Sequence, residues 1–163
     1  MIVAGLTIFL TGCARREYYS PVGLEAAGGK FLTEAVAERL VWPLKGQVVF
    51  SYGAREDRVG IKGIVIRADE GSLVRAAQDG RVSFVDESLS GYGRTVILEH
   101  SPDLTTVYAR HAEILVKLGQ WVRQGEPIAK IGRAGRGTFP QLYFEVRRRL
   151  KPEDPLKYLL TNA

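Results

Sequence analysis

The sequence is poor in the residues that form disulfides and bind metals. Its 163 residues include one cysteine and two histidines. One cysteine excludes an internal disulfide, and two histidines leave little for a zinc site, which takes about three His, Cys, Asp or Glu ligands. Internal repeats and low-complexity segments are also missing, so a repeat architecture is not indicated.

Signatures of other catalytic sites are missing as well. No serine lies in a nucleophile-elbow or triad pattern. Glu99 and Asp103 lie close to His100 in the sequence, and Glu145 follows Tyr143 on one face of an expected strand. We interpret these carboxylates as salt-bridge or turn residues rather than as an acid/base pair.

The composition is that of a globular chain. Apolar residues make up 45% and charged residues 25%, which predicts one domain with a short appendage. The net charge is +5, and the densest basic run holds Arg147, Arg148, Arg149 and Lys151. Two interpretations of this basic edge stay open, a solvated strand end and an anion-binding surface.

The N-terminus carries an export pattern. The apolar run from Ile2 to Leu10 is too short to span a bilayer but suits a signal-peptide core. The next residues complete Leu-Thr-Gly-Cys, which resembles the lipobox of bacterial lipoproteins. This resemblance implies a signal peptide over residues 1–12 and fatty acylation, such as palmitate, at Cys13. The alternative is a buried N-terminal strand with a chance cysteine.

Export narrows the possible partners. A lipid-anchored envelope protein does not meet nucleic acid, so its basic residues would face lipid head groups, cell-wall carboxylates or other envelope proteins. Ala14 after the cysteine favours the outer membrane, facing the periplasm, if the cell is Gram-negative.

The remaining chain divides into three parts. Residues 13–30 hold a Gly-Gly pair and few periodic apolar residues, and indicate a tether. Residues 31–41 predict a short helix with Leu40 on its apolar face. Residues 42–163 alternate short apolar stretches with glycine turns, including a hairpin-type Asp79-Gly80, and predict a mostly β fold, an antiparallel sandwich or barrel. The expected strands fall within residues 46–53, 63–68, 73–86, 94–100, 105–116, 120–132 and 141–149.

Five motifs in order resemble one known family, the LytM or lysostaphin-type zinc endopeptidases that cut peptidoglycan cross-links. They are "WPLKG", "EGSLVRAAQDGRVSFV", "SGYGRTVILEH", "GQWVRQGEPIAKIG" and "QLYFEVR" followed by "DPLKYL". The resemblance runs from Trp42 to about Leu160. It implies a LytM-like domain of the duplicated-hybrid-motif type, in which the second motif forms a central hairpin.

The family's zinc-site residues are replaced at all five positions. Its His-x-Gly-x-Asp segment matches "IKGIV", which places Ile61 and Val65 at the ligand positions. Its Tyr-Ala-His segment matches "YAR", with Arg110 at the histidine. Its His-x-His segment matches "QLY", with Gln141 and Tyr143. The resemblance therefore implies a degenerate member with no catalytic residue, no metal and no other cofactor.

The two histidines do not restore a metal site in the expected geometry. Strand alternation puts Tyr108 and Arg110 on one face and Ala109 and His111 on the other, away from the former site. We expect His111 and His100 to be surface or hydrogen-bonded residues rather than ligands.

Four functions compete. The resemblance favours a non-catalytic regulator that activates a cell-wall amidase or another peptidoglycan hydrolase in cell-wall remodelling or division. A second possibility is a scaffold that binds peptidoglycan or another envelope protein, and a third is a hydrolase with a different metal arrangement. The fourth is a biotinyl- or lipoyl-type carrier, which residues 119–132 also resemble. The carrier needs a lysine on a tight hairpin, and no lysine here has that setting.

The five replaced positions suggest what the former site does. We expect Ile61, Val65, Arg110, Gln141 and Tyr143 to form one groove that binds a partner peptide, with the arginine holding a carboxylate. The alternative is that these residues fill the old metal cavity as core, with Arg110 paired internally.

Overall fold

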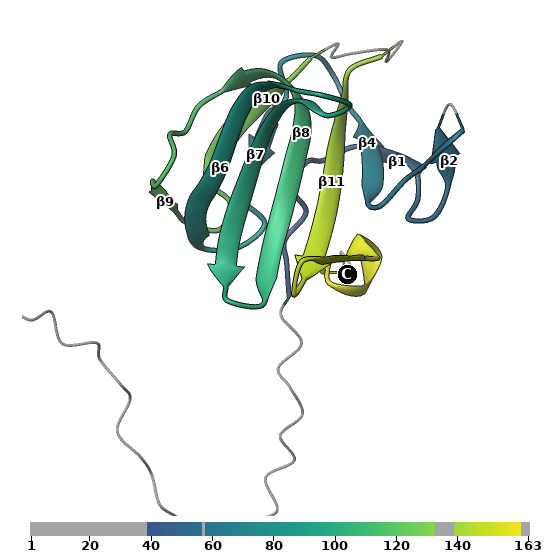
Figure 1. Cartoon of the computed structure of the whole chain (residues 1–163). Coiled ribbons are helices and arrows are strands. Elements are labelled where there is room, and N and C mark those ends of the chain that lie inside the picture. Colours follow the sequence, from purple (N-terminus) through teal and green to yellow (C-terminus); the bar gives the residue numbers. More distant parts are fainter. Residues whose placement is uncertain (1–38, 57, 133–138, 161–163) are drawn as a thin grey trace, which may run out of the picture. The chain divides into compact units, whose positions relative to one another are not determined.

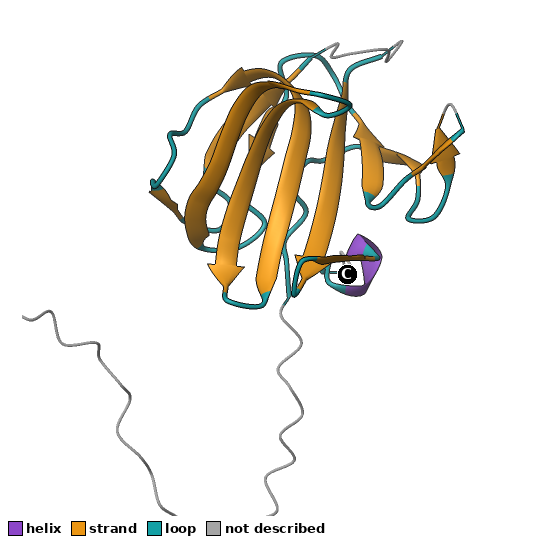
Figure 2. Cartoon of the chain, viewed as in Figure 1, coloured by secondary structure: helices purple, strands orange, loops and turns teal. Residues whose placement is uncertain are grey.

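The computed structural model describes residues 39–56, 58–132 and 139–160. Within them the chain is mostly β, as the sequence predicts, and it has a single turn of 3-10 helix, η1 (Figure 2). The elements are β1 (Gln47–Phe50), β2 (Arg55–Glu56), β3 (Val59–Gly60), β4 (Ile64–Arg67), β5 (Leu73–Arg75), β6 (Gly80–Leu89), β7 (Gly93–Ser101), β8 (Leu104–Ile114), β9 (Trp121–Val122), β10 (Pro127–Ile131), β11 (Gln141–Arg148), β12 (Lys151–Glu153) and η1 (Pro155–Lys157).

One large antiparallel sheet organises the domain. Its strand order is β1-β4-β11-β8-β7-β6-β9, and β12 adds to β11. The long strands β6, β7 and β8 form a meander, because each pairs with the next in the sequence (Figure 1). The end of β8 pairs with β10, which in turn pairs with β5. The sheet thus continues behind its own long strands, which closes the sandwich that the strand pattern predicts.

The main core fills the space inside this folded sheet. Its largest buried side chains include Tyr108 and Phe144, whose rings lie 5.3 Å apart. The Tyr108 hydroxyl accepts hydrogen bonds from the backbone N–H of Ala77 at 2.9 Å and from the Thr106 hydroxyl at 2.9 Å. Burial raises the pKa of Tyr108 to about 12, so this hydroxyl keeps its proton.

The predicted hairpin at Asp79-Gly80 is wrong, and so is the central hairpin over residues 70–85. β5 pairs with β10, and β6 pairs with β7 and β9. Gly80 serves a different purpose. A Cβ there would lie 2.7 Å from the His100 ring and 2.8 Å from the Glu99 carbonyl oxygen, so the glycine permits close packing of β6 against β7.

The N-terminal boundary also differs from the expectation. The last residues of the predicted 31–41 helix, from residue 39 on, are not helical, and Leu40 forms a parallel bridge with Leu159. Leu40 is fully buried in the core, so the folded unit begins before Trp42. Residues 1–38, which include Cys13, the expected signal peptide and tether, and the start of the expected helix, lie outside the described residues. Among the described residues, no helix is long and apolar enough to cross a membrane.

Candidate functional site

Three of the five replaced positions, Ile61, Val65 and Tyr143, meet on one face of the large sheet, together with Ala109. Tyr143 of β11 pairs with Val65 of β4 on one side and with Ala109 of β8 on the other. Directly paired residues point to the same face, so the three side chains adjoin. Ile61, in the loop before β4, packs into the same cluster. All four are buried, with at most 6% of each residue exposed.

Arg110 reaches this cluster through a β-bulge. The pairing of β7 with β8 matches Arg94 with His111 and Thr95 with Ala109, so Arg110 is left over. Its φ of +70° lies in the left-handed region, as at a bulge. The guanidinium carbon lies 5.6 Å from the centre of the Tyr143 ring, within cation–π range.

The bulge overturns the expected alternation along β8. Tyr108 is buried in the main core, while Ala109 belongs to the site cluster. Arg110 was expected at the site together with Tyr108, but it lies there beside Ala109, which was expected on the opposite face. The backbone N–H of Arg110 donates to the Tyr92 carbonyl at 3.0 Å, which holds the bulged residue over the site.

Arg110 has an internal partner. Its guanidinium donates to Glu56 of β2 through two nitrogens, with Nη2–Oε2 at 2.5 Å and Nη1–Oε1 at 3.2 Å. The side chains of Arg110 and Glu56 are 16% and 22% exposed. This bidentate pair matches the alternative in which Arg110 is paired internally. The side chains at these positions are therefore buried, and Arg110 is paired within the chain itself.

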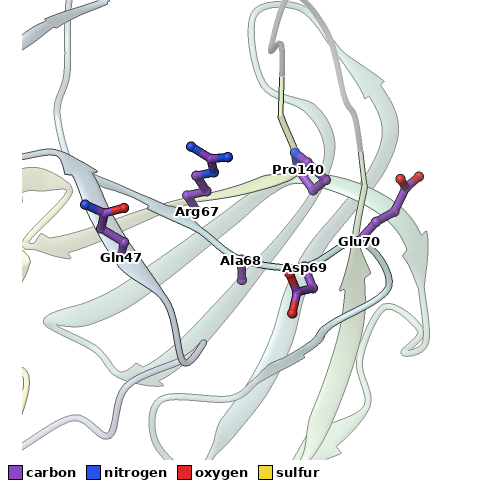
Figure 3. Close-up of a pocket in the computed structure, with 6 residues that line it drawn as sticks. All are labelled: Gln47, Arg67, Ala68, Asp69, Glu70 and Pro140. Carbon is purple, nitrogen blue, oxygen red and sulfur yellow. The ribbon is translucent and has the colours of Figure 1, made fainter.

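Gln141 lies at the other end of the same strand face. It precedes Tyr143 by two residues on β11 and pairs in register with Arg67 of β4. Only 2% of Gln141 is exposed, and its side-chain oxygen has no hydrogen-bond partner. Beside it lies a polar surface pocket, shown in Figure 3 and lined by Gln47, Arg67, Ala68, Asp69, Glu70 and Pro140. Sequence reasoning did not find this pocket.

A buried carboxylate anchors the other side of Tyr143. The Tyr143 hydroxyl donates to Glu145 at 3.0 Å, and Arg147 donates through Nε to the same carboxylate at 2.6 Å. Burial, helped by the negative charge of Glu145, raises the pKa of Tyr143. The phenol thus stays protonated and is a poor metal ligand. The interpretation of Glu145 as a salt-bridge residue is confirmed.

The basic run has acceptors for its first three members. Arg147 pairs with Glu145, and its hydrogen bond to that carboxylate raises its pKa. Arg148 donates to the Tyr158 hydroxyl at 3.2 Å, and Arg149 pairs with Asp103 at 3.2 Å. Lys151 is exposed. Three of the four basic residues thus have acceptors within the chain.

The two histidines differ in their surroundings. His100 is hydrogen-bonded as expected, with Nδ1 2.8 Å from the Asp79 carbonyl oxygen and Nε2 2.7 Å from the Thr106 hydroxyl. His111 is 1% exposed, and neither ring nitrogen meets hydrogen-bond geometry, so the expectation of a surface or hydrogen-bonded residue is wrong. Burial lowers the pKa of His111 to about 4, an effect that the nearby backbone of Tyr108 offsets only in part.

The residues at the former site do not fit a zinc ion. Ile61 and Val65 offer no donor atom, and Arg110 places a fixed cation where a dication would lie. Across residues 39–56, 58–132 and 139–160, no three His, Cys, Asp or Glu side chains gather closely enough to hold a metal ion.

Family comparison agrees with the fold and the motif order. Residues 59–155, more than half of the chain, match the model of peptidase family M23. The chain belongs to this family. The match covers the segment that also resembled biotinyl and lipoyl carriers and assigns it to the peptidase fold.

Relatives within the M23 family include both activators and peptidases. The chain is 38% identical over 118 residues to the murein hydrolase activator NlpD of Escherichia coli, covering 72% of this chain and 30% of that protein. It is 40% identical over 119 residues to the murein hydrolase activator EnvC of the same species, covering 72% and 28%. The catalytic domain of lysostaphin from Staphylococcus simulans shares the fold, with a TM-score of 0.63, 23% identity and 68% and 90% of the two chains covered. The chain thus spans less than a third of the two activators.

Proposed function

We propose that this chain is a non-catalytic envelope protein that binds and activates a peptidoglycan hydrolase, such as a cell-wall amidase, in cell-wall remodelling or division. The observation that carries the proposal is Arg110, whose guanidinium lies over Tyr143 where the family's enzymes hold a histidine. The names of NlpD and EnvC, both murein hydrolase activators, support the same role. We further propose that Cys13 is lipidated and that the protein faces the periplasm from the outer membrane of a Gram-negative cell.

The partner surface has a definite chemistry. The site is filled, so a partner docks on it rather than entering a deep groove. Tyr92 packs edge-on against Tyr143, with ring centres 5.3 Å apart, and Phe50 borders the same cluster. Apolar edges around one arginine suit an amphipathic peptide segment that carries a carboxylate.

Substitution at the site tests this proposal. Arg110→Glu reverses the charge, and Tyr143→Ala removes the ring beneath it. We expect Arg110→Glu to weaken binding of the purified amidase by about 2–5 kcal/mol, because a buried charge pair would become a repulsive one. Isothermal titration measures the affinity, and thermal unfolding shows whether each variant is folded. Two folded variants that bind as tightly as wild type would remove this site from the mechanism.

The polar pocket favours a second candidate, direct binding of peptidoglycan peptides. Arg67 and two acidic residues, Asp69 and Glu70, line it together. A stem peptide carries amino and carboxylate groups, which match the two signs of charge around the pocket. Co-sedimentation with purified sacculi that is lost in Arg67→Glu but kept in Arg110→Glu would favour this candidate over partner binding.

A further inference from the structure

The β2–β3 hairpin is a separate element that contacts the site through Glu56. Its two strands, Arg55–Glu56 and Val59–Gly60, pair only with each other (Figure 1). Its base is held by backbone hydrogen bonds, including Gly53 N–H to the Ile61 carbonyl at 2.9 Å. Among the described residues, the Arg110–Glu56 pair is the one side-chain hydrogen bond from these two strands to the rest of the domain.

An isolated two-stranded hairpin has little stability of its own. Strand pairs of this length are marginal in water, and Val59 is 68% exposed, so the hairpin buries little apolar surface. Beyond its backbone-bonded base, the hairpin is therefore held against the site by the ion pair with Arg110. Elements of low local stability are the ones that open when a ligand binds.

We propose that Arg110 is a carboxylate-binding site, that Glu56 is its internal ligand, and that an acidic side chain of the activated hydrolase displaces Glu56 and opens the β2–β3 hairpin. This inference rests on the proposed function and names the partner group that the site takes. Glu56 shows that the site accepts a carboxylate, because both of its oxygens contact the guanidinium. Bidentate pairing is the geometry in which arginine selects carboxylates.

Replacing Glu56 with a partner carboxylate keeps Arg110 paired, and this favours the exchange. Removing Glu56 alone would leave a mostly buried cation without a partner, which is costly. A partner carboxylate arriving at the same place restores the pair, while Glu56 regains hydration. Two contacts of Arg110 do not involve Glu56, because the Tyr92 carbonyl accepts from its backbone N–H and the Tyr143 ring lies beside its guanidinium. The site is thus preorganised, and the hairpin is the part that moves.

Two neutral variants separate this displacement from a purely structural ion pair. Glu56→Gln and Arg110→Gln both break the pair, so both should speed amide hydrogen exchange in the β2–β3 hairpin by about tenfold. Their effects on the affinity of the chain for the hydrolase should be opposite. The first frees Arg110 for the partner's carboxylate, and the second removes the binding group. Glu87→Gln, which breaks the exposed Arg94–Glu87 pair elsewhere, is the matched control.

The deciding experiment measures the concentration of chain that half-maximally stimulates a purified cell-wall amidase from the same organism on sacculi. It uses residues 14–163, which contain the whole described fold and its core from Leu40 to Leu159. We expect Glu56→Gln to lower this concentration about tenfold, Arg110→Gln to raise it about tenfold, and Glu87→Gln to leave it unchanged. If the half-maximal concentration of Glu56→Gln equals or exceeds that of wild type, the displacement is overturned, while the activator role still stands. A wild-type chain that stimulates no amidase would overturn the activator role and the displacement with it.

Discussion

At the scale of single residues, the bulge at Arg110 decides which side chains reach the site. The replaced positions could be predicted from motif spacing, because Ile61, Val65 and Tyr143 do meet. The bulge could not, since a positive φ at arginine leaves no mark on the apolar pattern. Alternation then assigned Tyr108 and Arg110 to one face, and the partner Glu56, 54 residues away, could not be found from sequence.

His111 makes stability depend on pH. Its folded pKa of about 4 lies below the ordinary value of 6.5, so the unfolded chain binds the proton more readily. The contribution of His111 to the free energy of unfolding is therefore fully present above pH 6.5, and it is lost as the pH falls toward 4. We expect the unfolding free energy to be about 2 kcal/mol lower at pH 5 than at pH 7 from this residue.

Urea unfolding of wild type and His111→Leu at both pH values measures this contribution. The leucine variant should lose that part of the pH dependence, and at pH 7 it should be no less stable, because it removes two unpartnered ring nitrogens. An equal pH dependence in the two proteins would mean that His111 titrates normally in the folded state.

At the scale of elements, the strands were predictable and their partners were not. Alternating residues mark β11, whose two neighbours β4 and β8 are antiparallel as expected. The pairing of β5 with β10 escaped prediction because local turn residues cannot report a contact more than fifty residues away. The buried bridge at Leu40 escaped because its periodicity also fits a helix.

Gly63 shows how tightly the loop before β4 lies against β11. A Cβ at this position would lie 2.1 Å from the Phe144 carbonyl oxygen, a backbone atom that cannot move without disturbing the sheet. Gly63→Ala should therefore lower the unfolding free energy by about 3 kcal/mol. Gly60→Ala is the matched control, because nothing lies within 4 Å of its Cβ. Chemical denaturation of both variants checks the difference, and similar losses in the two would argue against this close packing.

At the scale of the whole molecule, the family could be inferred from five ordered motifs, and the match over residues 59–155 confirms it. The closed state of the former metal site was only one of two interpretations of the sequence. The Arg110–Glu56 pair now favours it. The pair joins residues 54 positions apart, a contact that no local motif encodes.

The proposed lipid anchor makes a prediction about the whole chain. Cys13 is the only cysteine, so it is the only thiol that can be acylated. Each acyl chain contributes about 0.8 kcal/mol of membrane-binding free energy per buried CH₂. Several chains together therefore anchor a protein firmly. Metabolic labelling with a fatty-acid analogue should mark wild type and leave Cys13→Ala unlabelled. Equal labelling of both proteins would exclude this site.

The central claim is that the chain activates a peptidoglycan hydrolase and cuts nothing itself. The most direct test is mass spectrometry of the products released from purified sacculi by the chain alone, by the amidase alone and by both together, with zinc supplied throughout. We expect no products from the chain alone, and from the mixture a larger yield of the amidase's own products with no new cleavage type. Peptide cross-links cut by the chain alone, or a mixture that releases no more than the amidase does, would contradict the account.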